Sequence, residues 1–178
     1  MTVGELQALR DVARALGRPP DELAALIDFE TAGTWNPQLK NPGSSARGLI
    51  QFMDLTAREM GYNGSADLVA RFPTVEAQLR GPVLSYLSRY MPYPSLQALA
   101  MAVFYPAARY WDPEMSFPAV VQLANPGIRT VQDYVDQLER RLGSWSWLVG
   151  GALDAGAAVP WQLIAGVVVF FVLAWFLI

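Results

Sequence analysis

Glu30 occupies a position in which a carboxyl group could act as an acid near neutral pH. It follows Leu23, Leu26 and Ile27 at steps of three and four residues, so it shares one face of a predicted helix with these apolar side chains. Burial on that face and the partial negative charge at a helix C-terminus both favour the protonated carboxyl. The same spacing also allows Glu30 to lie in solvent at a frayed helix end, and the sequence leaves both possibilities open.

The composition restricts the other chemistry that the chain could perform. Neither histidine nor cysteine occurs, which excludes Ser-His and Cys-His relays, disulfide bonds and thiolate metal sites. We therefore expect no metal centre and no cofactor. The net charge of −3, without any run of Lys or Arg, argues against nucleic acid as a partner.

Two short motifs on either side of a turn-rich loop carry a family resemblance. FETAGTWNP, which contains Glu30, and SARGLIQFM resemble the Glu-Ser-Gly and Gly-Leu-x-Gln motifs of lytic transglycosylases, a family with a lysozyme-like fold. The chain most resembles phage members of the soluble-lytic-transglycosylase type, and MAVFYPAARY and NPGIRTVQDYV extend the similarity over residues 23–135. The resemblance implies that Glu30 is a single acid/base. It would protonate the glycosidic oxygen between N-acetylmuramic acid and N-acetylglucosamine, then deprotonate the muramoyl 6-hydroxyl to give a 1,6-anhydro product.

The sequence offers no obvious second acid for a hydrolytic mechanism. Conventional glycosidases use two carboxyl groups about 5 to 9.5 Å apart. Asp54 is the nearest candidate, but it opens a helical pattern and is better explained as a helix cap. A hydrolytic goose-type lysozyme and a noncatalytic glycan-binding or structural virion protein are the alternatives to a transglycosylase.

The Gly-Leu-Ile-Gln segment supplies the expected substrate contacts. Gly48 would let the backbone approach a sugar, Leu49 would pack beneath it, and Gln51 has both a donor and an acceptor for an N-acetyl group. The Asn, Pro, Gly and Ser residues before this segment specify turns. We expect that loop to bring the segment opposite Glu30.

Two aromatic residues are further candidates for binding a glycan. Trp35 and Tyr105 could each stack on a pyranose ring, although large apolar residues are as often part of a core. The resemblance favours Tyr105, whose hydroxyl could bond to Glu30 or to the substrate. The next residue, Pro106, stands where many relatives have Asn, so one usual polar contact is missing. In the first motif, Thr31 replaces Ser and can serve as the same kind of cap.

Helical periodicity runs through almost all of the first 142 residues, which predicts a mainly α, lysozyme-like domain at 1–142. Thr2 and Glu5 form a predicted capping box at its start. Only residues 48–53 suggest a short extended segment. The predicted helices cover residues 2–17, 21–33, 54–61, 74–91, 95–111 and 130–142.

The C-terminal part of the chain has a different character. Residues 163–178 carry no charged or strongly polar side chain, and extended back to Pro160 they would form a helix about 28 Å long, close to the ~30 Å core of a bilayer. We predict a transmembrane helix at 160–178; a buried core helix is the alternative, but it would show a polar face. Residues 143–159, rich in Gly, Ala and Trp, are predicted to be a linker, an interfacial segment or a second hydrophobic helix.

The apolar C-terminus and the phage resemblance together predict a location. Arg140 and Arg141 precede the apolar segment and no charge follows it, so the positive-inside rule would keep the domain in the cytoplasm, away from the cell wall. Delivery by a phage particle avoids this conflict. We therefore expect a virion-associated protein that is anchored in a viral or host membrane and acts on the bacterial wall, with peptidoglycan, lipid bilayer and other virion proteins as partners. A role in holin-assisted lysis stays open.

Overall fold

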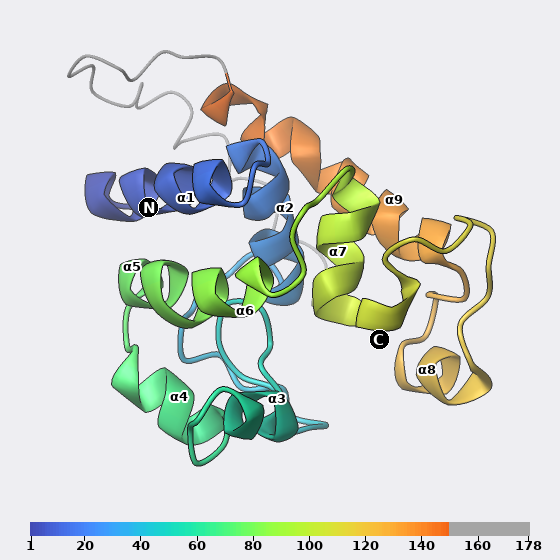
Figure 1. The fold of residues 1–178 in the computed structure, drawn as a ribbon, viewed down its shortest axis with the longest axis horizontal. Helices are drawn as coiled ribbons and strands as arrows, with labels where there is room; N and C mark the ends of the chain where they lie inside the picture. Colours follow the sequence, from blue (N-terminus) through green and yellow to red (C-terminus); the bar gives the residue numbers. More distant parts are fainter. Residues whose placement is uncertain (150–178) are drawn as a thin grey trace, which may run out of the picture.

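The computed structural model describes residues 1–149, which form a mainly helical head (Figure 1). Within these residues, extended segments pair only as isolated bridges, such as Arg47 with Phe52. The head also contains a π-helical segment, η1 (Leu79–Val83), and two 3-10 turns, η2 (Pro106–Ala108) and η3 (Ser146–Leu148). The α-helices are α1 (Val3–Ala15), α2 (Pro20–Glu30), α3 (Asp54–Glu59), α4 (Ser65–Arg71), α5 (Val75–Gln78), α6 (Leu84–Ser88), α7 (Leu96–Phe104), α8 (Ala119–Ala124) and α9 (Val131–Trp145).

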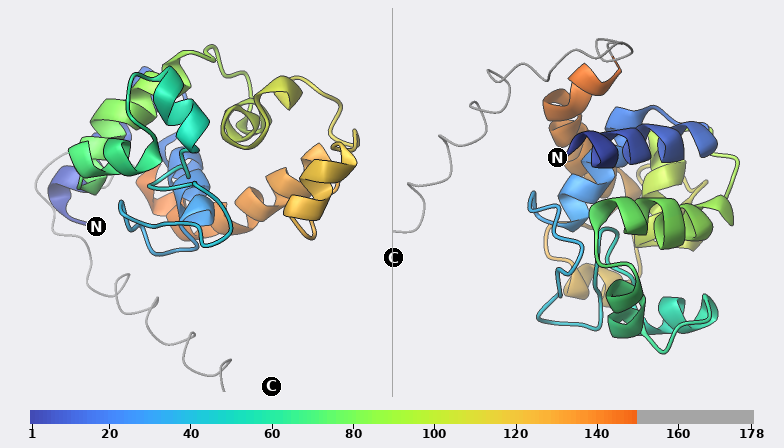
Figure 2. Two further views of the ribbon diagram at one scale, coloured as in Figure 1. Left: turned by 90° about the horizontal axis from the view of Figure 1, so that it is seen from below. Right: turned by 90° about the vertical axis from the view of Figure 1, so that its left-hand side faces the viewer.

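Helix α2 lies at the centre of the head and carries the predicted acid at its C-terminal end. Its most extensive contact is with α9, and α1 covers another side of it (Figure 1). Leu23, Leu26 and Ile27 are completely shielded from solvent, as the apolar stripe predicts, and so are Ala24 and Ala25. In the view from below, the loop after α2 curves around the end of this helix (Figure 2).

Several helix starts follow directly from side-chain chemistry. Thr2 and Glu5 form the predicted capping box of α1: the Thr2 side chain accepts from the Glu5 backbone N–H, and the Glu5 carboxylate accepts from the Thr2 backbone N–H. Thr130 and Asp133 form a second capping box at α9, and Ser95 caps α7. These contacts satisfy backbone N–H groups that have no partner within the helix.

Other elements differ from the sequence predictions. Residues 48–51 form a turn rather than an extended segment, and only Phe52 enters a bridge. The N-cap of α3 is Met53, and Asp54 is the first helical residue. Helices α4 and α8 were not predicted, because each is short and lies among turn-forming residues.

The end of the head differs from the predicted boundary at residue 142. Helix α9 passes through Leu142 to Trp145, and Leu148 is only 3% exposed. The ordered packing therefore extends to at least Leu148. Among residues 1–149, no helix has both the length and the apolar character needed to cross a bilayer. The predicted transmembrane helix at 160–178 and most of the predicted linker at 143–159 lie outside the described residues.

Candidate active site

The end of α2 is shaped by the residue that follows Glu30. Thr31 is completely buried; its hydroxyl donates to the Ile27 carbonyl at 2.7 Å and accepts from the Trp35 backbone N–H at 3.1 Å. Ala32 and Gly33 then adopt positive φ angles of 49° and 79°, which turn the chain out of the helix. Thr31 thus ends the helix in the way expected for a Ser at this position of the motif.

Glu30 meets a buried tyrosine from α9. The Tyr134 hydroxyl donates to Glu30 Oε1 at 2.5 Å. Tyr134 is fully buried, with Phe104 stacked on its ring at 4.4 Å between centroids and Phe29 edge-on at 5.1 Å. These aromatic contacts restrict the rotation of the Tyr134 ring.

Burial is the main influence on the pKa values of Glu30 and Tyr134. Removal of the carboxyl from water raises the pKa of Glu30 above its usual value, and the bond from Tyr134 opposes this rise without cancelling it. Burial, together with the nearby carboxyl, raises the pKa of Tyr134 well above its usual value, so its hydroxyl keeps its proton. Glu30 nevertheless keeps part of its surface exposed. The arrangement favours a protonated acid that a ligand can reach.

The tyrosine beside Glu30 is therefore not the one suggested by the sequence. Tyr105 follows α7, and its ring contacts Trp111 and Phe117 at centroid distances of 5.6 and 5.7 Å. It is partly exposed, so its expected contact with a sugar stays a prediction. Tyr134 lies on the apolar stripe of α9, and from the sequence alone it was indistinguishable from an ordinary core residue. Its place within the phage-like segment NPGIRTVQDYV was the only available signal.

The Gly-Leu-Ile-Gln segment forms a tight turn. Gly48 and Gln51 have positive φ angles of 80° and 50°, and the Gln51 Nε2 donates to the Gly48 carbonyl at 2.9 Å. This bond uses one of the two amide N–H groups, and the side chain remains partly exposed. Leu49 is fully buried, so it packs into the core instead of beneath a ligand.

A residue that sequence reasoning missed holds this turn in place. Gln78, at the end of α5, is fully buried. Its Oε1 accepts from the Leu49 backbone N–H at 3.0 Å, and its Nε2 donates to the Pro37 and Phe72 carbonyls at 2.5 and 3.0 Å. A Cβ at Gly48 would lie 2.7 Å from the same Oε1. Glycine is therefore required here by close packing against Gln78.

The Trp35 side chain contacts Asp28 and Trp145, so only part of its ring is available for stacking on a ligand. Its Nε1 donates to Asp28 Oδ1 at 3.2 Å, and its ring lies 5.1 Å from that of Trp145. Asp28 also pairs with Arg141, with 3.2 Å between Oδ2 and Nε. Both carboxylate oxygens of Asp28 are therefore engaged. Trp35 keeps some exposure, so stacking on a sugar remains a prediction.

Asp54 has a structural role. Its Oδ1 accepts from both the backbone N–H and the hydroxyl of Ser65, at 2.9 and 2.8 Å, and thereby joins the start of α3 to the start of α4. These bonds lower the pKa of Asp54, which is the reverse of what a general acid needs. Over the described part of the chain, no group of His, Cys, Asp or Glu is arranged to hold a metal ion.

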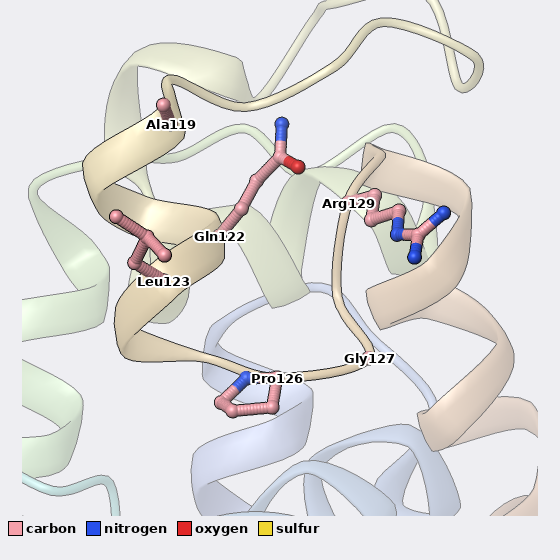
Figure 3. Close-up of a pocket in the computed structure, with 6 residues that line it drawn as sticks. All are labelled: Ala119, Gln122, Leu123, Pro126, Gly127 and Arg129. Carbon is pink, nitrogen blue, oxygen red and sulfur yellow. The ribbon is translucent and has the colours of Figure 1, made fainter.

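A surface hollow of about 450 Å³ lies between α8 and the loop that leads to α9 (Figure 3). It contains none of the residues predicted to bind or cut a substrate. Its lining consists of Ala119, Gln122, Leu123, Pro126, Gly127 and Arg129.

Comparisons with known proteins identify no relative: no protein-family model, no curated protein and no solved structure matches this chain. A function for the head must therefore be argued from its own residues and from the motif resemblance.

Proposed function

We propose that the head is a peptidoglycan lytic transglycosylase in which Glu30 is the single acid/base. The observation that supports this most directly is the hydrogen bond from the neutral Tyr134 hydroxyl to the Glu30 carboxyl, whose pKa is raised by burial. A general acid needs both features, since it must hold a proton near neutral pH and present it in a fixed direction.

The bond from Tyr134 determines which oxygen carries the transferable proton. Because the Tyr134 hydroxyl donates to Oε1, the proton of the neutral acid belongs on Oε2. In the proposed reaction Oε2 protonates the glycosidic oxygen, and the resulting carboxylate, still bonded to Tyr134, accepts the proton of the muramoyl 6-hydroxyl. The carbon–oxygen bond to the leaving sugar breaks and an intramolecular ether forms, so no water is consumed.

The two other acidic residues near these motifs are engaged elsewhere. Asp28 is paired with Arg141, and Asp54 is bound to Ser65. A hydrolase of the two-carboxylate type would need one of them free to act on the opposite face of the sugar or on a water molecule. Their engagement favours the single-carboxylate mechanism over a goose-type lysozyme.

The wider assignment follows the motif resemblance. We propose that Gln51, with Gly48 in the same turn, contacts the N-acetyl region of the glycan, and that Tyr105 and Trp35 offer their partly exposed rings to it. We also propose that the protein is virion-associated, attached to a bilayer through residues 160–178, and works with other virion proteins against the host wall.

The test is cleavage of purified peptidoglycan by the full chain in mild detergent, with mass analysis of the products. Anhydro ends are expected. Reducing ends would indicate a hydrolase, and uncut glycan would exclude an enzyme of this class. Glu30→Gln should lower the rate by about 10²- to 10⁴-fold, the usual effect of losing a general acid, whereas Glu139→Gln at an exposed position of α9 should have no effect.

A further inference from the structure

Three consecutive residues at the end of α2 contact two residues of α9. Asp28 pairs with Arg141, and Glu30 accepts from Tyr134. Phe29, between them, meets both partners: its ring lies edge-on to Tyr134 at 5.1 Å, and the Arg141 guanidinium carbon lies 5.0 Å from its centroid. The catalytic hydrogen bond and the ion pair therefore belong to one continuous contact.

The spacing of Tyr134 and Arg141 along α9 makes both of their contacts depend on how α9 lies on α2. Tyr134 and Arg141 are seven residues apart, which puts them on one face of the helix, two turns and about 10 Å from each other. The Phe29 ring occupies the space between them. A slide or a rotation of α9 on α2 would break both contacts together.

The Asp28 carboxylate also holds the loop that leads to the Gly-Leu-Ile-Gln turn. Its Oδ1 accepts from Trp35 Nε1, while its Oδ2 faces Arg141. The side chains of Asp28 and Arg141 are only 20% and 31% exposed. Solvent screens such a pair less than an open surface pair. The Asp28 carboxylate thus joins α2, α9 and the loop that follows α2, and it lies two residues before Glu30.

We propose that Asp28 and Arg141 are positioning residues for Glu30, whose ion pair sets the register of α9 on α2 and so keeps the Tyr134 hydroxyl on Glu30 Oε1. This inference rests on the proposed function for its catalytic consequence, but the placement of Tyr134 can be measured without activity. Neither residue touches the reacting atoms.

The first measurement is a mutant cycle on the full chain. Asp28→Asn combined with Arg141→Gln removes the pair without changing the net local charge. We expect kcat to fall on the order of 10-fold, the scale of a small misplacement of a catalytic group, with KM unchanged. In a Tyr134→Phe background the same double change should cost nothing further, because the pair acts through the hydroxyl. An equal loss in both backgrounds would show a merely structural role.

The second measurement follows the Glu30 carboxyl carbon by ¹³C NMR as the pH changes. Tyr134 lowers the pKa of Glu30, so the double variant should raise that pKa toward the value found for Tyr134→Phe. A wild-type pKa in a folded double variant would overturn the proposal. If the wild-type chain cut no glycan, the proposed function would fail, and this titration would still decide whether the pair places Tyr134.

Two further variants test whether the effect is specific to the Asp28–Arg141 pair. Arg141→Lys keeps the charge but loses the planar group that lies on Phe29; it should raise the pKa of Glu30 by part of the amount seen in the double variant, and no rise would count against the proposal. Asp67→Asn breaks the more exposed pair with Arg71 on α4 and should leave both kcat and the Glu30 titration at wild-type values. A change of either in Asp67→Asn would mean that any lost ion pair has this effect, and would overturn the proposal.

Discussion

Replacement of Tyr134 by Phe removes one hydroxyl from the centre of the head and leaves the ring contacts intact. The ring stays between Phe29 and Phe104, so no large cavity is created. The change isolates the hydrogen bond to Glu30. Its effect on stability should depend on pH, because the acceptor is a titrating group.

The magnitude follows from the protonation state of Glu30. With the carboxyl neutral, the bond should contribute about 1 kcal/mol, and with the carboxylate ionised about 2 to 3 kcal/mol, the usual range for a charged acceptor. Burial raises the pKa of Glu30, so the stability that this group contributes is fully present below the pKa of an unfolded glutamate and is lost as the pH rises through the folded-state pKa. The loss of stability caused by Tyr134→Phe should increase as the pH rises through the folded-state pKa of Glu30.

The assay is chemical denaturation of wild type and variant from acid to mildly alkaline pH. Tyr93→Phe is the matched control: its buried hydroxyl donates to the Leu87 carbonyl at 2.6 Å, an acceptor that does not titrate, so its cost should stay near 1 kcal/mol throughout. A pH-independent cost for Tyr134→Phe would refute the reasoning. In a cleavage assay, the variant's raised Glu30 pKa should also carry the alkaline limb of activity to higher pH.

Two further predictions concern the packing around the site. Gln78→Ala should lower the free energy of unfolding by about 2 kcal/mol, since it leaves the buried Leu49 N–H without a partner, at a typical 1 to 3 kcal/mol, and removes the side-chain bonds to the partly buried Pro37 and Phe72 carbonyls. A thermal melt like that of wild type would contradict this. A chain ending at residue 149 should keep the melting cooperativity of the wild-type head, whereas one ending at residue 142 loses buried Leu148 and the Trp145 contact, worth about 2 kcal/mol or more. Equal melting temperatures for the two would show that the head closes by residue 142.

Local patterns were enough to predict most of the helical elements. The helix predicted at 2–17 is present as α1, and so is its Thr2–Glu5 capping box. Both depend on contacts within a few residues, where propensity and periodicity carry the information. The central place of α2 was not predicted, although Ala24 and Ala25 make its apolar surface broader than the stripe of Leu23, Leu26 and Ile27.

The partners at the site could not be predicted in this way. Tyr134 is 104 residues from Glu30, and Gln78 is 29 residues from Leu49. From the sequence alone, Tyr134 cannot be distinguished from an ordinary core tyrosine, or Gln78 from a surface glutamine. Only the packing of α9 on α2, and of α5 against the turn, distinguishes them. The pairing of Asp28 could not be predicted for the same reason, since its partner Arg141 lies on α9.

The kind of donor beside Glu30 matters for the proposed chemistry. A guanidinium or ammonium group at 2.5 Å would hold the carboxyl equally well, but it would strongly favour the ionised form and abolish the acid. A phenol hydroxyl also orients the carboxyl, but it lowers the pKa of Glu30 less than a cation would. Burial therefore remains the larger influence, and the pKa of Glu30 stays raised. Arg141, the cation in this contact, lies two turns from Tyr134 along α9 and is paired with Asp28. In the proposed mechanism the acid is thus held by a neutral donor, which is the arrangement that a single carboxyl needs if it must give up a proton and then take one back.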